Sequence, residues 1–530
     1  LYDRDNLSFI LVRDEEGGSL MANGYARVAE TLGVCCGTTG GGTTKLVTGV
    51  ASAYMDSVPL LAMTGQIETS KFGRGAFQES TAEGRSLDAV GLFKGHTKYS
   101  SLVFQPTTMA RKARKAIRAA LSGRPGPVHL NIPFDVQNEP LEKERQYPQQ
   151  AYRPSNDLFD RDGVKKAVKL LSKSEKVALI AGAGMLSQKG GLAIKAFATE
   201  LGIPVVTSLK GKGAIDERLP FCFGCHGLVG TPAAHRLLRS GIEVLIACGT
   251  SFNEFSTDAW DNAISPSKGL IQIDIDSEEI GKNHPVEVGI VGDGARVLTE
   301  LIFEARRQKL DKKYSLKQLN TLKSLYGGMF HLPDKIAATC NHILPQRVMA
   351  ELREALPDNA IVIGDSGNNC AFALHYFPCH RTGGFLTGMG LGTMGYAAGA
   401  AVGAQVAAGT TPVVAICGDG AFVMHMNEVA TAVQYQIPVI WLVLNDARLG
   451  MVYCAQKFKM NNRIIGSTYS QLPLAKLARD MGAMGISVKS PGRVKQAVRK
   501  ALRAKEPTVI EVLIDRNEVP PMAARLGKAS

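Results

Sequence analysis

Pro412-Val413-Val414-Ala415-Ile416-Cys417-Gly418-Asp419-Gly420 reads as a buried strand that ends in a glycine turn. A helix-length segment follows at residues 421–436, and a second apolar run, residues 438–444 (PVIWLVL), then ends at Asn445-Asp446. Short apolar runs of this kind are typical of strands that are buried on both faces of a parallel sheet. A right-handed crossover through the intervening helix would place both strands in one sheet.

Oxygen-bearing side chains follow both predicted strands at their carboxyl ends. Asp419 follows the first strand, and Asn445 and Asp446 follow the second. Open α/β sheets bind ligands at this edge, and carboxylate and amide oxygens suit a Mg²⁺ ion that holds a phosphorylated cofactor. The alternative is that these are ordinary turn residues at two strand ends.

The alternation of strands and helices runs through the whole chain and divides it into three blocks. The first block has predicted strands at residues 8–12, 34–36, 59–64 and 128–132, and predicted helices at 20–30, 46–55 and 109–121. The second has predicted strands at 177–181, 204–207, 244–247 and 270–275, with a helix at 190–201. Such alternation predicts parallel sheets. We therefore expect an α/β protein of three doubly wound domains, at residues 1–145, 155–310 and 340–530, with linkers near 141–160 and 306–345.

The composition is that of a globular protein. Of the 530 residues, 45% are hydrophobic and 21% are charged, and no apolar run has the length of a membrane span. The ten cysteines show no CxxC spacing, which favours a reducing compartment. No signal peptide is visible, so we expect a cytoplasmic protein without a membrane partner. The chain begins at Leu1, and we expect that its first domain, with any targeting segment, is truncated there.

The net charge of +13 comes largely from basic runs such as residues 111–115 and 493–505. These runs have helical character and no interleaved aromatic residues. Solvated helix faces therefore explain the charge better than a nucleic-acid surface does. The positive charge also suits anionic small-molecule substrates.

A glycine motif in the third block allows a rival interpretation. Residues 390–395 (GLGTMG) match G-x-G-x-x-G, a strand-like FLT precedes them, and a small-residue helix follows. Taken literally, this is a nicotinamide dinucleotide fingerprint with Asp419 as its ribose acid. That interpretation leaves residues 445–450 and the acidic residues near the N-terminus unexplained.

Together these motifs resemble the thiamine-diphosphate-dependent enzymes, most closely the acetolactate synthase group, over nearly the whole chain. The strongest match is Gly418-Asp419-Gly420 followed by Asn445-Asp446. Further matches are the segments at residues 390–395 (GLGTMG), 76–79 (AFQE), 123–127 (GRPGP) and 273–276 (IDID). The resemblance implies a pyrimidine-binding first domain, a central domain and a diphosphate-binding third domain.

The resemblance assigns the metal ligands. Asp419, Asp446 and the backbone carbonyl of Arg448 would bind Mg²⁺. The family usually has Asn-Asn where this chain has Asn445-Asp446, so the resemblance leaves open which of these two residues is the ligand. An aspartate at 446 still offers hard oxygen atoms, and it adds a negative charge beside the diphosphate.

The diphosphate contacts also follow from the resemblance. Gly420 and Ala421 would donate backbone N–H groups, as glycine turns do. The segment Gly367-Asn368-Asn369 lies where the family also contacts the diphosphate, although the family often has His at the position of Asn369.

Glu15 matches the family's activating glutamate. It follows the predicted strand at residues 8–12, and its carboxyl group would share a proton with the aminopyrimidine ring of the cofactor. The alternative is an acidic residue favoured at a helix N-terminus by the helix dipole. Because Glu15 and the metal residues belong to different domains, the resemblance implies a homodimer or homotetramer with active sites at the subunit interface.

The resemblance also assigns the residues around the reacting part of the cofactor. The carbonyl of Gly392 would accept the pyrimidine amino group, Met394 would hold the cofactor in its bent form, and Met451 would line the pocket. On the substrate side the expected residues are Gly41, Phe77 and Gln78.

The chain departs from the family pattern at two places. Acetolactate synthases that make branched-chain precursors carry a Trp where this chain has Ala455, and a small residue there should widen the pocket. In the central block, Ser251 and Phe255 stand where flavin-binding members have arginines. The central block therefore argues against FAD.

These observations predict an enzyme that uses thiamine diphosphate and Mg²⁺. It would decarboxylate a 2-oxo acid and join the product to a second carbonyl compound, as an acetolactate synthase does, with a bulkier or aromatic 2-oxo acid suggested by Ala455. The alternatives within the superfamily are a non-oxidative 2-oxo acid decarboxylase and a 2-hydroxyacyl lyase. Outside it, the alternatives are a nicotinamide-dependent oxidoreductase and a nucleic-acid-binding protein.

Overall fold

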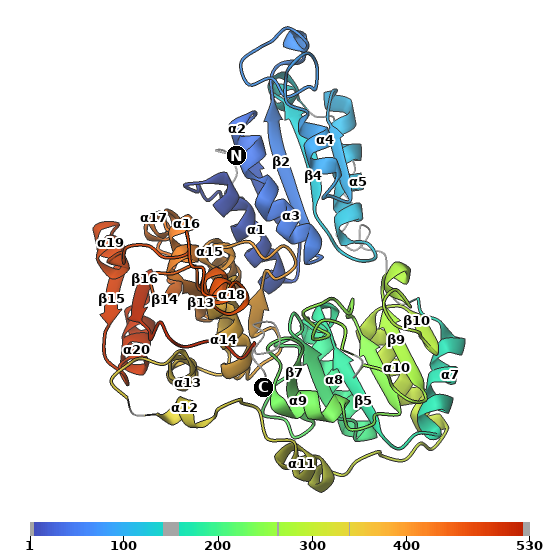
Figure 1. Ribbon diagram of the computed structural model, residues 1–530. Coiled ribbons are helices and arrows are strands. Elements are labelled where there is room, and N and C mark those ends of the chain that lie inside the picture. Colours follow the sequence, from blue (N-terminus) through green and yellow to red (C-terminus); the bar gives the residue numbers. More distant parts are fainter. Residues whose placement is uncertain (1–4, 141–157, 262–263, 339, 523–530) are drawn as a thin grey trace.

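The computed structural model describes residues 5–140, 158–261, 264–338 and 340–522. These residues form three bodies, each built on one parallel sheet with helices packed against it (Figure 1). The predicted class, three parallel-sheet α/β domains, is confirmed. Most of the predicted linker at 141–160 lies outside the described residues, and the domain boundaries stay predictions.

The first domain contains a four-stranded sheet. In spatial order its strands are β1 (Gly33–Gly37), β2 (Leu60–Gln66), β4 (Val128–Pro133) and β3 (Tyr99–Leu102), all parallel. Its helices are α1 (Glu15–Ala29), α2 (Gly41–Lys45), α3 (Val47–Met55), α4 (Ala89–Lys94), α5 (Met109–Leu121) and α6 (Phe134–Asn138). Alternate residues of β2 enter two different cores, so both faces of this sheet are covered.

The predicted strand at residues 8–12 is wrong. These residues pair with no strand, and the backbone N–H of Leu11 instead donates to the hydroxyl of Tyr435 in the third domain, at 2.8 Å. An apolar run of five residues predicts burial, but it does not show whether a sheet edge or another domain supplies the partner.

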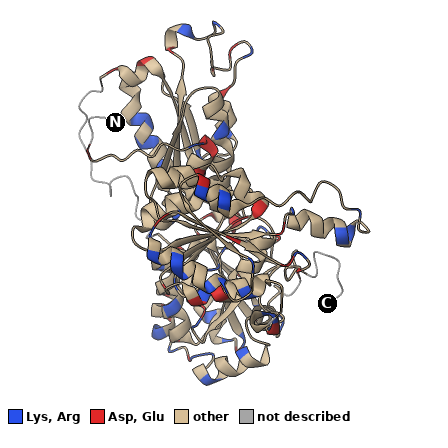
Figure 2. Ribbon diagram, turned by 90° about the vertical axis from the view of Figure 1, so that its left-hand side faces the viewer, with Lys and Arg blue, Asp and Glu red and all other residues tan. Residues whose placement is uncertain are grey.

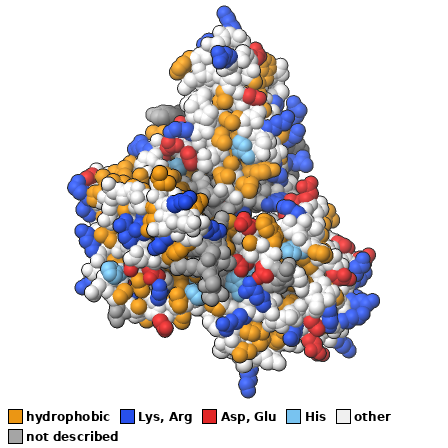
Figure 3. All heavy atoms as spheres, in the orientation of Figure 1, with side chains coloured by type: hydrophobic (Ala, Val, Ile, Leu, Met, Phe, Trp, Pro, Cys, Tyr) orange, Lys and Arg blue, Asp and Glu red, His pale blue; other side chains and the backbone are white. Residues whose placement is uncertain are grey.

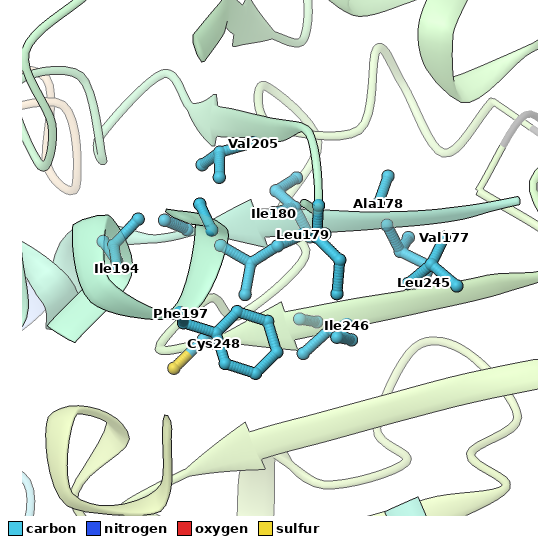
Figure 4. Close-up of a cluster of buried hydrophobic side chains, with 14 of the residues drawn as sticks. Val177, Ala178, Leu179, Ile180, Ile194, Phe197, Val205, Leu245, Ile246 and Cys248 are labelled. Carbon is cyan, nitrogen blue, oxygen red and sulfur yellow. The ribbon is translucent and has the colours of Figure 1, made fainter. Parts of the chain in front are cut away.

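The central domain contains a six-stranded parallel sheet. Its spatial order is β10 (Val288–Val291), β9 (Gly269–Asp274), β8 (Val244–Cys248), β5 (Val177–Ala181), β6 (Val205–Ser208) and β7 (Cys222–His226). Helices α7 (Arg161–Ser172), α8 (Gln188–Leu201), α9 (Pro232–Leu238) and α10 (Gly294–Arg307) accompany it. Figure 4 shows how Phe197 of α8 lies over the buried side chains of β5 and β8.

The third domain contains the second six-stranded parallel sheet. Its spatial order is β12 (Phe385–Thr387), β11 (Ile361–Gly364), β13 (Val413–Gly418), β14 (Ile440–Asn445), β16 (Thr508–Leu513) and β15 (Met484–Val488). Its helices are α13 (Pro345–Ala355), α14 (Asn368–Tyr376), α15 (Tyr396–Ala408), α16 (Asp419–Met424), α17 (Glu428–Gln434), α18 (Gly450–Lys459), α19 (Leu474–Asp480) and α20 (Val494–Ala504). Along β13 the side chains alternate between two cores, which is why this strand reads as continuously apolar.

Two further expectations need correction. The segment at 421–436 is not one helix, because α16 ends at Met424 and α17 begins at Glu428, with His425 between them. The region at 306–345 is not simply irregular, since it holds α11 (Leu316–Leu325) and α12 (Asp334–Ala337). A Ser315 capping box with Gln318 starts α11, a local signal that the basic composition obscured.

The first domain packs on the third through α1 and α15 (Figure 1). A Cβ atom on Gly24 would overlap the carbonyl oxygen of Ala400, and one on Gly403 would overlap that of Met21. The two helices therefore approach at backbone distance, which only glycine permits. This explains the small-residue composition of α15.

One buried aspartate joins all three domains. Asp56, at the end of α3, is 2.6 Å from the ammonium nitrogen of Lys210 in the central domain, and it accepts the backbone N–H of Gly390 in the third at 3.0 Å. The carboxylate thus fixes the loop that carries the glycine motif at 390–395.

The charged residues are spread along the ribbon in all parts of the molecule seen in Figure 2. Within the described residues, no helix has the length and apolarity needed to cross a membrane. The expected cytoplasmic location stays a prediction.

Candidate active site

The two strands that opened the sequence analysis end at one edge of the third sheet. Gly418 of β13 is in register with Leu444 of β14, so Asp419 and Asn445 emerge beside each other. Burial and the neighbouring carboxylate of Asp419 raise the pKa of Asp446 to about 6, and burial also raises the pKa of Asp419. Two partly desolvated carboxylates in contact favour a bound cation.

The donor set fits Mg²⁺ only if uncharged oxygens complete it. Among the described residues, no group of three or more His, Cys, Asp or Glu side chains could hold a metal. However, the side-chain carbonyls of Asn445 and Asn368 are buried without a hydrogen-bond donor. Carboxylate, amide and backbone oxygens together are a ligand set that Mg²⁺ accepts.

Asn445 and Asp446 are held differently. Asn445 is buried, and its amide nitrogen donates to Glu511 at 2.8 Å and to the carbonyl of Leu472 at 3.2 Å. The side chain of Asp446 is half-buried, and its backbone carbonyl accepts from Arg516 at 3.0 Å. Asn445 is therefore tied to the neighbouring strand β16 through its amide nitrogen, which leaves its carbonyl oxygen available, and Asp446 offers a carboxylate beside it.

Tyr469 was not anticipated from the sequence. Its hydroxyl donates to the backbone carbonyl of Arg448 at 3.1 Å and also bonds to Asp419, so it contacts two predicted metal-ligand groups. The same hydroxyl lies 2.7 Å from the place where a Cβ on Gly420 would stand. The residues from 447 to 449 and from 467 to 469 are joined by backbone hydrogen bonds, which hold the tyrosine in place.

The predicted diphosphate donors lie at the start of a helix. Gly420 and Ala421 belong to the first turn of α16, and Asp419, its first residue, accepts the backbone N–H of Ala447 at 2.8 Å. That bond ties the glycine turn to the loop after β14. Free N–H groups in a first helical turn favour an anionic group.

The two asparagines at the start of α14 differ in availability. The side-chain amide of Asn369 is already hydrogen-bonded within the domain. It donates to the backbone carbonyl of Ile416 at 3.3 Å and accepts the backbone N–H of Cys370 at 2.7 Å. Asn368 has a free side-chain carbonyl and faces the start of α18 near Gly450. Of the two asparagines, Asn368 is therefore the one whose side-chain oxygen is available to bind a metal ion. Gly367 caps the helix at φ 117°, where a side chain would be strained.

The first residue of α1 is Glu15. Its carboxyl oxygen lies 3.0 Å from the position of a Cβ on Gly42, at the carboxyl end of the first sheet. Asp14 caps the helix and pairs with Lys45. The activating glutamate predicted from the resemblance therefore lies beside the glycine turn of its own domain.

The third domain holds the start of this helix. Glu428 accepts the backbone N–H of Asp14 at 3.0 Å and that of Arg13 at 3.3 Å, and His425 lies 3.4 Å from the carboxylate of Glu16. These contacts join the first and third domains of one chain. The predicted homodimer or homotetramer with active sites at the subunit interface stays a prediction.

The predicted substrate residues gather near Glu15. Gly41 starts α2, and the side chain of Gln78 packs 3.0 Å from the position of a Cβ on Gly40. Glu79 holds this loop by accepting three backbone N–H groups, at 2.6 to 3.1 Å. Phe77, in contrast, is 87% exposed.

The glycine motif at 390–395 adjoins the diphosphate turn. Met394 reaches to 3.6 Å from the position of a Cβ on Gly420, and Gly392 has φ 72°. Asp365, which the sequence analysis missed, accepts the backbone N–H groups of Gly395 and Ala397 and so fixes the start of α15. Burial raises the pKa of Asp365 to about 6. Its position at the end of an apolar run was the available signal.

The described residues bring Gly367, Gly392 and Met451 to one hollow of the third domain. Phe255 of the central domain also lines it. Three of the predicted cofactor residues thus share one hollow, and the metal-loop residues are not part of its described lining.

Comparison with known families agrees with this architecture. Three models match: the N-terminal TPP (thiamine pyrophosphate) binding domain of thiamine pyrophosphate enzymes at residues 1–85, the central domain at 164–301, and the C-terminal TPP binding domain at 365–512. The last match contains the metal loops and the glycine motif.

Curated relatives are similar over nearly their whole length. A probable acetolactate synthase large subunit of Methanocaldococcus jannaschii is 36% identical over 100% of this chain and 89% of its own. The acetolactate synthase large subunit of Corynebacterium glutamicum is 33% identical over 99% of this chain and 83% of its own. Isozyme 2 from Escherichia coli K12 is 32% identical over 99% and 92%. The chain therefore belongs to the thiamine pyrophosphate enzymes, and it is an enzyme of their carboligase type, similar to acetolactate synthase large subunits.

Proposed function

We propose that this enzyme decarboxylates a 2-oxo acid and joins the remaining acyl group to a second carbonyl compound. The observation that carries the proposal is the pair of carboxylates, Asp419 and Asp446, beside the glycine turn of α16. The start of α1, with Glu15, is held against the same domain through Glu428. Bound thiamine diphosphate supplies the electron sink for decarboxylation. The protein supplies the metal site, the N–H donors and the acid.

Each residue has a defined task in this proposal. Asp419, Asp446 and the Arg448 carbonyl hold Mg²⁺, and the N–H groups of Gly420 and Ala421 hold the diphosphate. Glu15 holds and returns a proton at the aminopyrimidine ring. The backbone hydrogen bonds from Arg13 and Asp14 to Glu428 keep Glu15 in place for this exchange.

A wider donor pocket is the second part of the proposal. Ala455 lies one helical turn after Met451 on α18, so both face the same side. A small residue there leaves room for a bulkier or aromatic 2-oxo acid. We propose no FAD, because Ser251 and Phe255 replace the expected arginines.

We propose a homodimer or homotetramer. Large apolar side chains are exposed on the first and third domains, and Figure 3 shows hydrophobic side chains gathered on both. Among them are Val34, Tyr54, Met55, Val423 and Met424. Exposed apolar patches of this kind mark interaction surfaces.

Calorimetry and a product assay test the function. We expect the protein to bind thiamine diphosphate only with Mg²⁺, and to release CO₂ from pyruvate and from phenylpyruvate. Glu15→Gln should bind the cofactor but lose at least 100-fold in CO₂ release. Full activity of this variant would refute the role of Glu15. Release of CO₂ with an aldehyde as sole product would instead identify a simple decarboxylase.

A further inference from the structure

A hollow lies where the central domain meets the third domain. It measures about 550 Å³, part of it open to solvent. The third domain contributes most of the lining, and the central domain contributes Val229 and Phe255. Gly367, Gly392 and Met451, which the resemblance assigns to the cofactor, also line it, so a ligand in the hollow would lie against the bound cofactor.

The lining is apolar. Its large side chains are Val229, Phe255, Leu374, Met389, Met451 and Met522. No Arg, Lys or His belongs to the lining, as far as the described residues show, and Asp365 is the single charged member. Methionine side chains adapt to ligands of different shape.

Two polar side chains of the lining, Asp365 and Tyr396, are already hydrogen-bonded elsewhere. Asp365 accepts backbone N–H groups from Ser366, Gly395 and Ala397, at 2.7 to 2.9 Å. The Tyr396 hydroxyl donates to Asn23 at 2.9 Å and accepts from Arg27 at the same distance. The guanidinium of Arg27 also donates to the Thr387 carbonyl and does not line the hollow.

This chemistry discriminates between two classes of second substrate. A second 2-oxo acid would bring a carboxylate against the described lining residues, which include no cation, and an unpaired anion loses its hydration there. An aldehyde with an alkyl or aryl group carries no charge, and its hydrocarbon part gains from burial.

We propose that the hollow binds the second substrate, and that this substrate is an uncharged aldehyde with an apolar alkyl or aryl group rather than a second 2-oxo acid. This inference rests on the proposed decarboxylase and carboligase function. The 2-oxo acid loses its carboxylate as CO₂, its former carbonyl carbon forms a bond to the aldehyde carbon, and the aldehyde oxygen takes up one proton. The product is a 2-hydroxy ketone, and no oxidant or reductant is needed.

Binding of unreactive probes tests the hollow without turnover. The full chain, loaded with thiamine diphosphate and Mg²⁺, is titrated calorimetrically with 2-heptanone and with hexanoate. We expect the neutral ketone to bind at least tenfold more tightly than the acid. Equal binding, or tighter binding of hexanoate, would overturn the inference.

Turnover with pyruvate as donor provides the second test. Hexanal and benzaldehyde are compared with 2-oxobutanoate as acceptors, and the 2-hydroxy ketones and 2-hydroxy-2-alkyl acids formed are quantified by mass spectrometry. We expect at least tenfold more product from the aldehydes. CO₂ release with preferred use of 2-oxobutanoate would overturn this inference and leave the proposed function intact, whereas the absence of CO₂ release would refute the proposed function itself.

A charge placed in the hollow should reverse the preference. We expect Phe255→Arg to raise hexanoate binding and 2-oxobutanoate use at least tenfold, because the guanidinium pairs with a carboxylate. Phe255→Met is the matched control, since it stays apolar and should keep the preference for the neutral probe. The thermal midpoint of each variant shows whether it is folded. If folded Phe255→Arg behaves like Phe255→Met, the side chain at 255 does not face the second substrate, and the inference falls.

Discussion

The carboxylate of Glu428 in the third domain accepts the backbone N–H of Asp14, one residue before Glu15, at 3.0 Å. Glu428 is fully buried, and it also accepts from Arg13 and, at 2.6 Å, from the Thr431 hydroxyl. A side chain more than 400 positions away in the sequence thus fixes where the predicted catalytic acid begins its helix.

Glu428→Gln should lower activity without removing the acid. The glutamine keeps one acceptor oxygen, but its NH2 group replaces the other, so at least one backbone N–H loses its acceptor, which costs about 1–3 kcal/mol in a buried site. We expect kcat to fall about tenfold with KM for the 2-oxo acid nearly unchanged, as measured by steady-state CO₂ release. Glu354→Gln, which removes an exposed pair with Lys495, is the control and should change neither. An unchanged kcat in Glu428→Gln would show that α1 does not need this anchor.

Asp365 should make stability depend on pH. Burial raises its pKa from 3.8 to about 6, so the folded state holds the proton more tightly than the unfolded state. Its contribution is therefore fully present below pH 3.8 and is lost as the pH rises through 6. At about 1.4 kcal/mol per tenfold change in proton affinity, the loss is about 3 kcal/mol.

Urea denaturation of the wild type and Asp365→Asn at pH 4 and pH 7 measures this effect. We expect the wild type to lose about 3 kcal/mol more of its free energy of unfolding between these pH values than the variant does. Parallel behaviour of the two proteins would mean that Asp365 titrates normally.

Tyr469→Phe should strengthen metal binding. The hydroxyl of Tyr469 bonds to both the Arg448 carbonyl and Asp419, so it competes with Mg²⁺ for these oxygens. Its removal should tighten Mg²⁺ binding about fivefold in calorimetry with thiamine diphosphate present, equivalent to about 1 kcal/mol. Tyr453→Phe is the control, since that ring stacks on the side chain of Arg448 instead. Weaker Mg²⁺ binding by Tyr469→Phe would contradict this prediction and show that the hydroxyl holds Asp419 and the Arg448 carbonyl in position for the metal.

Gly24→Ala should separate the first and third domains. The added methyl group would overlap the Ala400 carbonyl, and a backbone cannot move aside as a side chain does. We expect a loss of about 3 kcal/mol in unfolding free energy, together with weaker activity, in paired denaturation and CO₂ assays. Ala29→Val at the exposed end of α1 is the control. Wild-type stability in Gly24→Ala would mean that α1 and α15 can move apart freely.

The sequence predicted best what depends on local pattern. Strands such as residues 177–181 and the helix at 109–121 match the structure, because continuous apolar runs and amphipathic spacing are local properties. The adjacency of Asp419 and Asn445 followed from two buried strands with one crossover between them. Parallel register then brings their ends together without further information.

The features that the sequence did not predict correctly depend on contacts between residues far apart in the chain. Residues 8–12 are apolar like a strand, yet their partner is Tyr435 of another domain. Tyr469 and Glu428 stand in segments without a recognisable motif, and they matter only because of what they touch. Asp365 ends an apolar strand just as Asp419 does, but its carboxylate faces the start of a helix. Only the glycine after Asp419 distinguishes the two aspartates locally, because Ser366 follows Asp365.

The contact of α1 with Glu428 of the same chain has a consequence for genetic complementation. If each chain carries its own Glu15 and Asp419 into one site, then two inactive forms, Glu15→Gln and Asp419→Asn, stay inactive when their subunits are mixed. If partners exchange these residues, then random hybrids recover about a quarter of the sites, because half of the dimers are mixed and one of their two sites is intact. The activity of the mixed subunits therefore shows whether Glu15 and Asp419 of one active site come from the same chain or from two chains.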